Sequence, residues 1–186
     1  MSTSLVLFTA LVALVALERV AELRVSQRNA QWSVRNGGVE SGRSHYLPMV
    51  ALHTALLAGA VVEVWARRPD FVPLLGFPML ALVLGSQALR WWCIRTLGRQ
   101  WNTRVIVVPG LALVREGPYR WFTHPNYVAV VVEGFALPLV GSAWIAAICF
   151  TLLNAALLTA RIRVENRALT QSAQPARLAP PARGAM

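Results

Sequence analysis

Five long apolar segments constrain the fold of this chain of 186 residues more than any other feature. They cover residues 4–17, which continue past a charged pair, and residues 46–65, 73–94, 126–140 and 142–160. A helix needs about 20 apolar residues to cross a hydrocarbon core of about 30 Å. In lipid, backbone polar groups must pair internally, which favours helices. The sequence therefore predicts an all-α, polytopic integral membrane protein with about five transmembrane helices.

Composition supports this assignment. With 56% hydrophobic and 14% charged residues, the chain is too apolar for an ordinary soluble domain of its size. We expect one transmembrane domain at residues 1–170, with its catalytic half at 95–169, and a disordered cytoplasmic tail at 171–186. Cys93 and Cys149 lie in apolar stretches without metal-ligand spacing, so no metal site is expected.

The net charge of +10 fits a membrane topology better than nucleic-acid binding. All 18 basic residues are arginine, and their positions follow the apolar segments instead of forming one patch. Only Arg67 and Arg68 lie between the second and third segments. The positive-inside rule then predicts an outside N-terminus, a cytoplasmic C-terminus and a cytoplasmic loop between the third and fourth segments. We expect membrane lipids, and no nucleic acid, as partners.

That loop, just before the last helical hairpin, carries the most concentrated functional signal. It contains Gly117-Pro118-Tyr119 and then His124-Pro125-Asn126-Tyr127, directly before an apolar run. Pro125 suits the first turn of a helix, because its missing N–H would be unpaired there. The helix N-terminus then lies beside His124, where free backbone N–H groups and Arg120 can bind a carboxylate.

A second polar segment, residues 97–104, lies upstream of this loop. Its glycine, its arginines and Trp101 can cradle an anionic cofactor, with Arg104 as a candidate ligand. Alternatively, Trp101 belongs to an interfacial tryptophan belt and the arginines meet anionic lipid headgroups. Residues 105–108 are typical of a short strand.

Polar residues also follow one face of each of the last two segments. Asn126 and Glu133 share a face of the fourth, so a carboxylate lies inside an apolar helix. Glu133 is a candidate general base, a counter-charge to a sulfonium or the partner of an arginine. Asn154, Arg161 and Glu165 form the stripe on the fifth segment.

The second stripe also has a simpler interpretation. Arg161 and Glu165 can form an i,i+4 ion pair at the helix end, with Asn154 as a helix-to-helix contact. Because the two stripes agree, we favour a shared polar cavity.

Weaker signals lie in the first three segments. Glu18 and Glu22 indicate a charged helix end at the interface, and Glu63 with Arg67 indicates an interfacial pair. His53 either acts on substrate at membrane depth or is a neutral histidine satisfied by another helix.

The C-terminal half resembles the isoprenylcysteine carboxyl methyltransferase family of integral membrane enzymes. The resemblance is carried by Gly117-Pro118-Tyr119 with His124-Pro125-Asn126-Tyr127, and by Arg161-Ile162-Arg163-Val164-Glu165-Asn166 in the last segment. It extends back through Leu97-Gly98-Arg99-Gln100-Trp101. Residues 22–40 look like a bacterial branch that includes methyltransferases of alkylpyrones and alkylresorcinols made by type III polyketide synthases.

The resemblance implies S-adenosylmethionine as the cofactor. His124, Pro125 and Tyr127 would hold it, Glu165 would close its pocket, and Arg161 would orient or neutralise the acceptor. Thr123 stands where the family usually has an arginine, and Glu165-Asn166 replaces a common acidic pair. The resemblance then implies either a weaker affinity for the cofactor or a transfer of that charge role to Arg120, Arg99 or Arg104.

We therefore expect an S-adenosylmethionine-dependent O-methyltransferase whose acceptor is a lipophilic small molecule from the bilayer. The acceptor group is an alkylpyrone or polyketide hydroxyl, or an isoprenylcysteine-like carboxylate. The candidate catalytic residues are Arg161, Glu133 and Asn154. The candidate cofactor-binding residues are Tyr119, His124, Pro125, Asn126, Tyr127, Glu165, Arg104 and Trp101. The alternatives are a phospholipid N-methyltransferase and a non-enzymatic small transporter or assembly protein.

Overall fold

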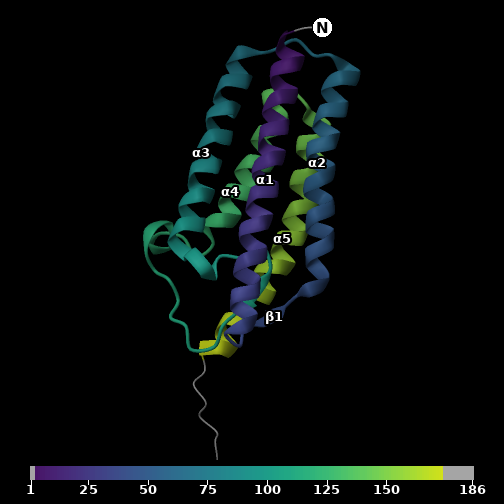
Figure 1. The fold of residues 1–186 in the computed structure, drawn as a ribbon. Coiled ribbons are helices and arrows are strands. Elements are labelled where there is room, and N and C mark those ends of the chain that lie inside the picture. The colour runs from purple at the N-terminus through teal and green to yellow at the C-terminus, as the bar shows by residue number, and fades with distance from the viewer. Residues whose placement is uncertain (1–2, 174–186) are drawn as a thin grey trace, which may run out of the picture.

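Five helices form the bundle in the computed structural model, which describes residues 3–173. They are α1 (Thr3–Arg35), α2 (Tyr46–Arg67), α3 (Pro73–Leu97), α4 (Pro125–Val140) and α5 (Trp144–Ala173). In Figure 1, α3 and α2 flank α1, and α4 and α5 lie behind it. Residues 174–186, most of the tail predicted at 171–186, lie outside the described part.

Four of these helices, α1, α2, α3 and α5, are long and apolar enough to cross a membrane. The fifth, α4, has only 16 residues and is about 24 Å long at 1.5 Å per residue. It turns into α5 through Gly141 and Ser142, as a tight helical hairpin requires. The predicted all-α polytopic class is confirmed, with a short fourth helix.

A small ribbon closes the end of the bundle opposite the N-terminus of α1, and we call this the ribbon end. Strand β1 (Val39–Ser41) pairs antiparallel with β2 (Val105–Val107), with Glu40 opposite Ile106. The strand predicted at 105–108 is confirmed, whereas β1 was not predicted. Short 3-10 turns, η1 (Arg43–His45), η2 (Gly98–Gln100) and η3 (Gly117–Arg120), complete this end.

The opposite half of the bundle is a packed apolar core. Leu5, Phe8 and Val12 of α1 pack with residues of α2 and α4 such as Val64 and Leu137. At this end, the Glu63 carboxylate accepts hydrogen bonds from the backbone N–H groups of Ile145 (3.1 Å) and Ala146 (2.8 Å). These N–H groups lie in the first turn of α5 and have no partner within the helix. Glu63 also pairs with Arg67 at 3.1 Å, which confirms the predicted pair.

Substitution of Gly134 by alanine is expected to destabilise the bundle. A Cβ at Gly134 would lie 1.9 Å from Cε1 of Phe150, a buried ring, so one of the two helices must shift. Overpacking of this kind costs about 1–3 kcal/mol. The measurement is the midpoint of SDS-induced unfolding in detergent micelles.

Gly59→Ala is the matched control, because a Cβ at Gly59 of α2 meets nothing within 4 Å. It should leave the midpoint unchanged. The double variant Gly134→Ala with Phe150→Leu should regain part of the loss, and equal midpoints for the two glycine variants would contradict the packing argument.

Candidate functional site

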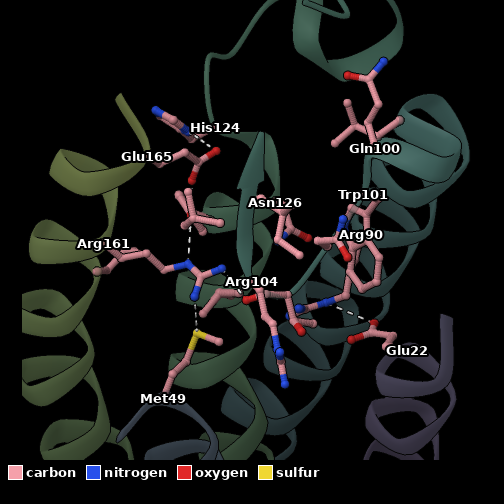
Figure 2. A pocket seen from close by; sticks show the side chains of 18 of the residues that line it. Glu22, Met49, Arg90, Gln100, Trp101, Arg104, His124, Asn126, Arg161 and Glu165 are labelled. Atoms are coloured by element: carbon pink, nitrogen blue, oxygen red, sulfur yellow. Dashed lines mark hydrogen bonds and ion pairs between the residues drawn. The ribbon is translucent and has the colours of Figure 1, made fainter. Parts of the chain in front are cut away.

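The ribbon half of the bundle contains a cavity of about 810 Å³. This volume lies within the range of about 300–1,000 Å³ that is typical of small-molecule sites. All five helices and the segment between α3 and α4 contribute to its walls. Figure 2 shows Arg161 and Glu165 on one side of the cavity and Arg90 with Glu22 on the other.

Most of the residues predicted from the sequence line this single cavity. They are Trp101, Arg104, Tyr119, His124, Asn126, Tyr127, Asn154, Arg161 and Glu165. Pro125 is buried behind the wall as the first residue of α4, and Glu133 belongs to the ion network described below. The α5 stripe and Asn126 of the α4 stripe therefore share one cavity, whereas Glu133 is not among its lining residues.

Tyr127 connects the two charged residues of the α5 stripe. Its hydroxyl donates to Glu165 Oε2 and accepts a hydrogen bond from Arg161 Nε at 2.9 Å. The simpler interpretation, a direct Arg161–Glu165 ion pair, is wrong, because the Tyr127 hydroxyl lies between the two charged groups.

Arg161 is a buried cation, with an exposed fraction of 6%. Its other nitrogens donate to the carbonyl oxygen of Thr103 and to Met49 Sδ at 3.4 Å. Among residues 3–173, no carboxylate forms an ion pair with it. A buried charge without a counter-ion is costly, so this group favours binding of an anion.

His124 lies beside Glu165 at the N-terminus of α4. Its Nδ1 is 3.7 Å from Glu165 Oε1, its Nε2 is 3.1 Å from Asn166 Oδ1, and its ring stacks on Tyr127. Pro125 begins the helix as predicted. The N–H of Tyr127 already bonds to the His124 carbonyl at 3.1 Å, so fewer free N–H groups remain than the sequence predicted.

Trp101 is a wall residue of the cavity, with an exposed fraction of 2%, which excludes it from an interfacial belt. Asn29 of α1 donates to its carbonyl oxygen at 2.7 Å and fixes the segment after α3. Trp92 and Trp121 are instead exposed and pack edge to face, as belt residues would.

Two further residues of the loop line the cavity. Arg104 lies over the ring of Tyr46 at 4.8 Å and is 3.7 Å from Glu40. Desolvation on burial raises the pKa of Tyr119 above its ordinary value, so its hydroxyl stays protonated and can donate a hydrogen bond.

Glu133 belongs to a buried ion network of four residues, Arg19, Glu22, Arg90 and Glu133. Glu133 Oε2 accepts from Arg19 at 2.9 Å and from Arg90 at 2.8 Å. Glu22 pairs with Arg19 at 2.5 Å and with Arg90 at 3.5 Å, so charges alternate around a closed ring. Of the three roles that the sequence allows for Glu133, its contacts match the arginine partner, and its predicted catalytic role stays a prediction.

The sequence interpretation of Glu22 as part of a charged, interfacial helix end is wrong. Glu22 is 3% exposed and pairs with Arg90 of α3, and Glu18 accepts a hydrogen bond from Trp91 Nε1. Sequence reasoning also missed Met49 and the Thr103 carbonyl as partners of Arg161. For the burial of Glu22, the available signal in the sequence was Arg19, which lies three residues earlier in the same long helix and can pair with it.

The bundle and its polar cavity are those of an integral membrane methyltransferase, because residues 79–171 match a family of such enzymes. The chain belongs to the isoprenylcysteine carboxyl methyltransferase (ICMT) family. It is also 36% identical, over 167 residues, to a Bacillus subtilis (strain 168) protein named Uncharacterized protein YpbQ. That similarity covers 89% of this chain and 98% of the relative, so it extends beyond the family match into α1 and α2.

Proposed function

We propose that this methyltransferase uses S-adenosylmethionine to methylate an oxygen of a lipophilic acceptor. The observation that carries the proposal is Arg161, a buried guanidinium without a carboxylate partner among the described residues. It faces a cavity that also presents the Glu165 carboxylate. A site with a buried cation that lacks a carboxylate partner and with a separate carboxylate suits a positively charged donor and an acidic oxygen.

The residues of the cavity wall fit such a donor. Three buried polar atoms, Trp101 Nε1, Asn102 Oδ1 and Asn126 Oδ1, have no hydrogen-bond partner in the described chain. Such atoms are costly unless something pairs with them, and a nucleoside offers both donors and acceptors. The stacked His124 and Tyr127 rings add a flat aromatic surface.

In this proposal, the residues at the α4 N-terminus hold the donor. S-adenosylmethionine, when bound, supplies a methyl group on a positively charged sulfur. Glu165 provides a counter-charge, and Tyr127 holds that carboxylate in place through its hydroxyl. Because methyl transfer needs alignment more than covalent catalysis, fixing these groups is the main contribution of the protein.

Apolar residues from α2, α4 and α5 form the other part of the cavity. Val50, Leu57, Val130 and Leu157 lie among the lining residues. They suit the hydrocarbon tail of an acceptor, while Arg161 orients its polar head. The arginine distribution supports a cytoplasmic position for the ribbon end, where a water-soluble donor would enter.

The first test is calorimetry of the detergent-solubilised protein with S-adenosylhomocysteine. We expect saturable binding well below millimolar ligand, because the cavity offers both charge and unpaired polar atoms. Absence of binding at millimolar ligand would remove the proposal. Incubation with isotopically labelled S-adenosylmethionine and a membrane lipid extract, followed by mass spectrometry, then reports the class of the methylated product.

A further inference from the structure

His53 lies on α2 and lines the cavity near its boundary with the apolar core. Its ring packs edge to face on Phe150 of α5, with centroids 5.2 Å apart and an interplanar angle of 84°. Phe150 in turn lies against Gly134. The imidazole therefore packs on a Phe150 ring that is itself held against α4.

One hydrogen bond fixes the tautomer of this ring. His53 Nδ1 is 2.8 Å from the carbonyl oxygen of Met49, one turn earlier in α2. A carbonyl oxygen can only accept, so Nδ1 carries the hydrogen and Nε2 keeps its lone pair. Within residues 3–173, no side chain or backbone group bonds to Nε2, and it is not among the buried unpaired atoms. Nε2 is thus an accessible proton acceptor.

Met49 contacts both His53 and Arg161. Its carbonyl oxygen pairs with His53, and its sulfur accepts from Arg161 Nη1 at 3.4 Å. Asn154, one turn after Phe150 in α5, lines the same cavity as His53 and Arg161. A neutral base, a buried cation and an amide therefore surround one volume.

We propose that His53 is the general base for a hydroxyl acceptor, which deepens and rests on the proposed methyltransferase function. The hydroxyl proton passes to His53 Nε2 as the oxygen forms its bond to the methyl carbon. The bond between that carbon and the donor sulfur breaks, and its electron pair remains on sulfur. Arg161 stabilises the developing oxyanion, so the preferred acceptor is a weakly acidic hydroxyl, not a carboxylate, which needs no base.

The charged groups nearest His53 do not supply a competing base. Arg19 of α1, Arg90 of α3 and Glu133 of α4 act on it electrostatically, and they belong to the closed ion network. Arg161 of α5 is linked to it only through Met49. The Glu133 oxygen in this network already accepts from two guanidinium groups.

The test uses three long-chain probes: 3-pentadecylphenol, a more acidic nitro-substituted 3-pentadecylphenol and hexadecanoic acid. A well-placed general base contributes about 10²–10⁴-fold, so His53→Gln should slow methylation of 3-pentadecylphenol at least about 100-fold. The loss should shrink for the nitrophenol, which is already ionised, and S-adenosylhomocysteine affinity should stay unchanged. A purely structural role would affect both phenols equally.

His45→Gln is the matched control, because His45 lies just before α2 and is not a cavity residue. Equal losses on the two phenols, or undiminished turnover of 3-pentadecylphenol by His53→Gln, would overturn the inference. So would a wild-type protein that methylates only hexadecanoic acid. These outcomes leave the proposed function standing, whereas failure of the wild type to bind S-adenosylhomocysteine defeats the proposed function itself.

Discussion

Replacement of Glu165 by alanine is expected to lower the affinity for S-adenosylmethionine by about tenfold to 100-fold. The Glu165 carboxylate lines the cavity, accepts from Tyr127 and lies 3.7 Å from His124 Nδ1. Its removal takes away the negative charge beside the proposed position of the methyl donor. It also leaves the positive charge of Arg161 with less negative charge nearby. The measurement is isothermal titration calorimetry in detergent.

Arg163→Ala is the control for this change, since Arg163 is exposed on the same helix two residues earlier. It should bind the ligand as the wild type does. Glu165→Gln, which keeps the shape and one hydrogen-bond acceptor, should fall between the two. Wild-type affinity in Glu165→Ala would show that the donor is held elsewhere in the cavity.

Replacement of Glu133 by glutamine is expected to reduce the stability of the bundle by about 3–5 kcal/mol, because breaking a buried ion pair leaves its partners uncompensated. In this case the half-buried Arg19 and the buried Arg90 lose their shared carboxylate and retain Glu22 as their one carboxylate partner among the described residues. The measurement is the midpoint of SDS-induced unfolding, together with S-adenosylhomocysteine affinity under conditions where the variant is folded.

Arg43→Gln serves as the reference for an exposed pair. The Arg43 side chain is 83% exposed and pairs with Glu40 at 3.3 Å, so its loss should cost at most about 1 kcal/mol. If Glu133→Gln keeps wild-type stability but loses turnover, the network is not a structural element and Glu133 acts in catalysis.

Most of the fold could be predicted from the sequence, because an apolar segment in lipid must pair its backbone polar groups internally and therefore forms a helix. Pro125 predicted the start of α4 through local backbone rules alone. The pairing of β1 with β2 was not accessible, because three-residue strands far apart in the chain carry too little pattern to specify a partner.

The candidate site divides in the same way. Helical spacing put Asn154, Arg161 and Glu165 on one face, and the structure has all three in the cavity wall. Spacing cannot say that the Tyr127 hydroxyl separates the two charges, nor that Arg161 reaches Met49 on α2. Those contacts depend on how helices pack, which local sequence does not encode.

The closed ion network also bears on how the protein is assembled during synthesis. Helix α1 leaves the ribosome long before Glu133 of α4 exists, yet it carries Arg19 into the lipid. Glu22 lies one turn away on the same helix and neutralises that arginine at 2.5 Å. Arg19 and Glu22 can therefore enter the membrane as one balanced pair, and Arg90 and Glu133 can join later as a second balanced pair.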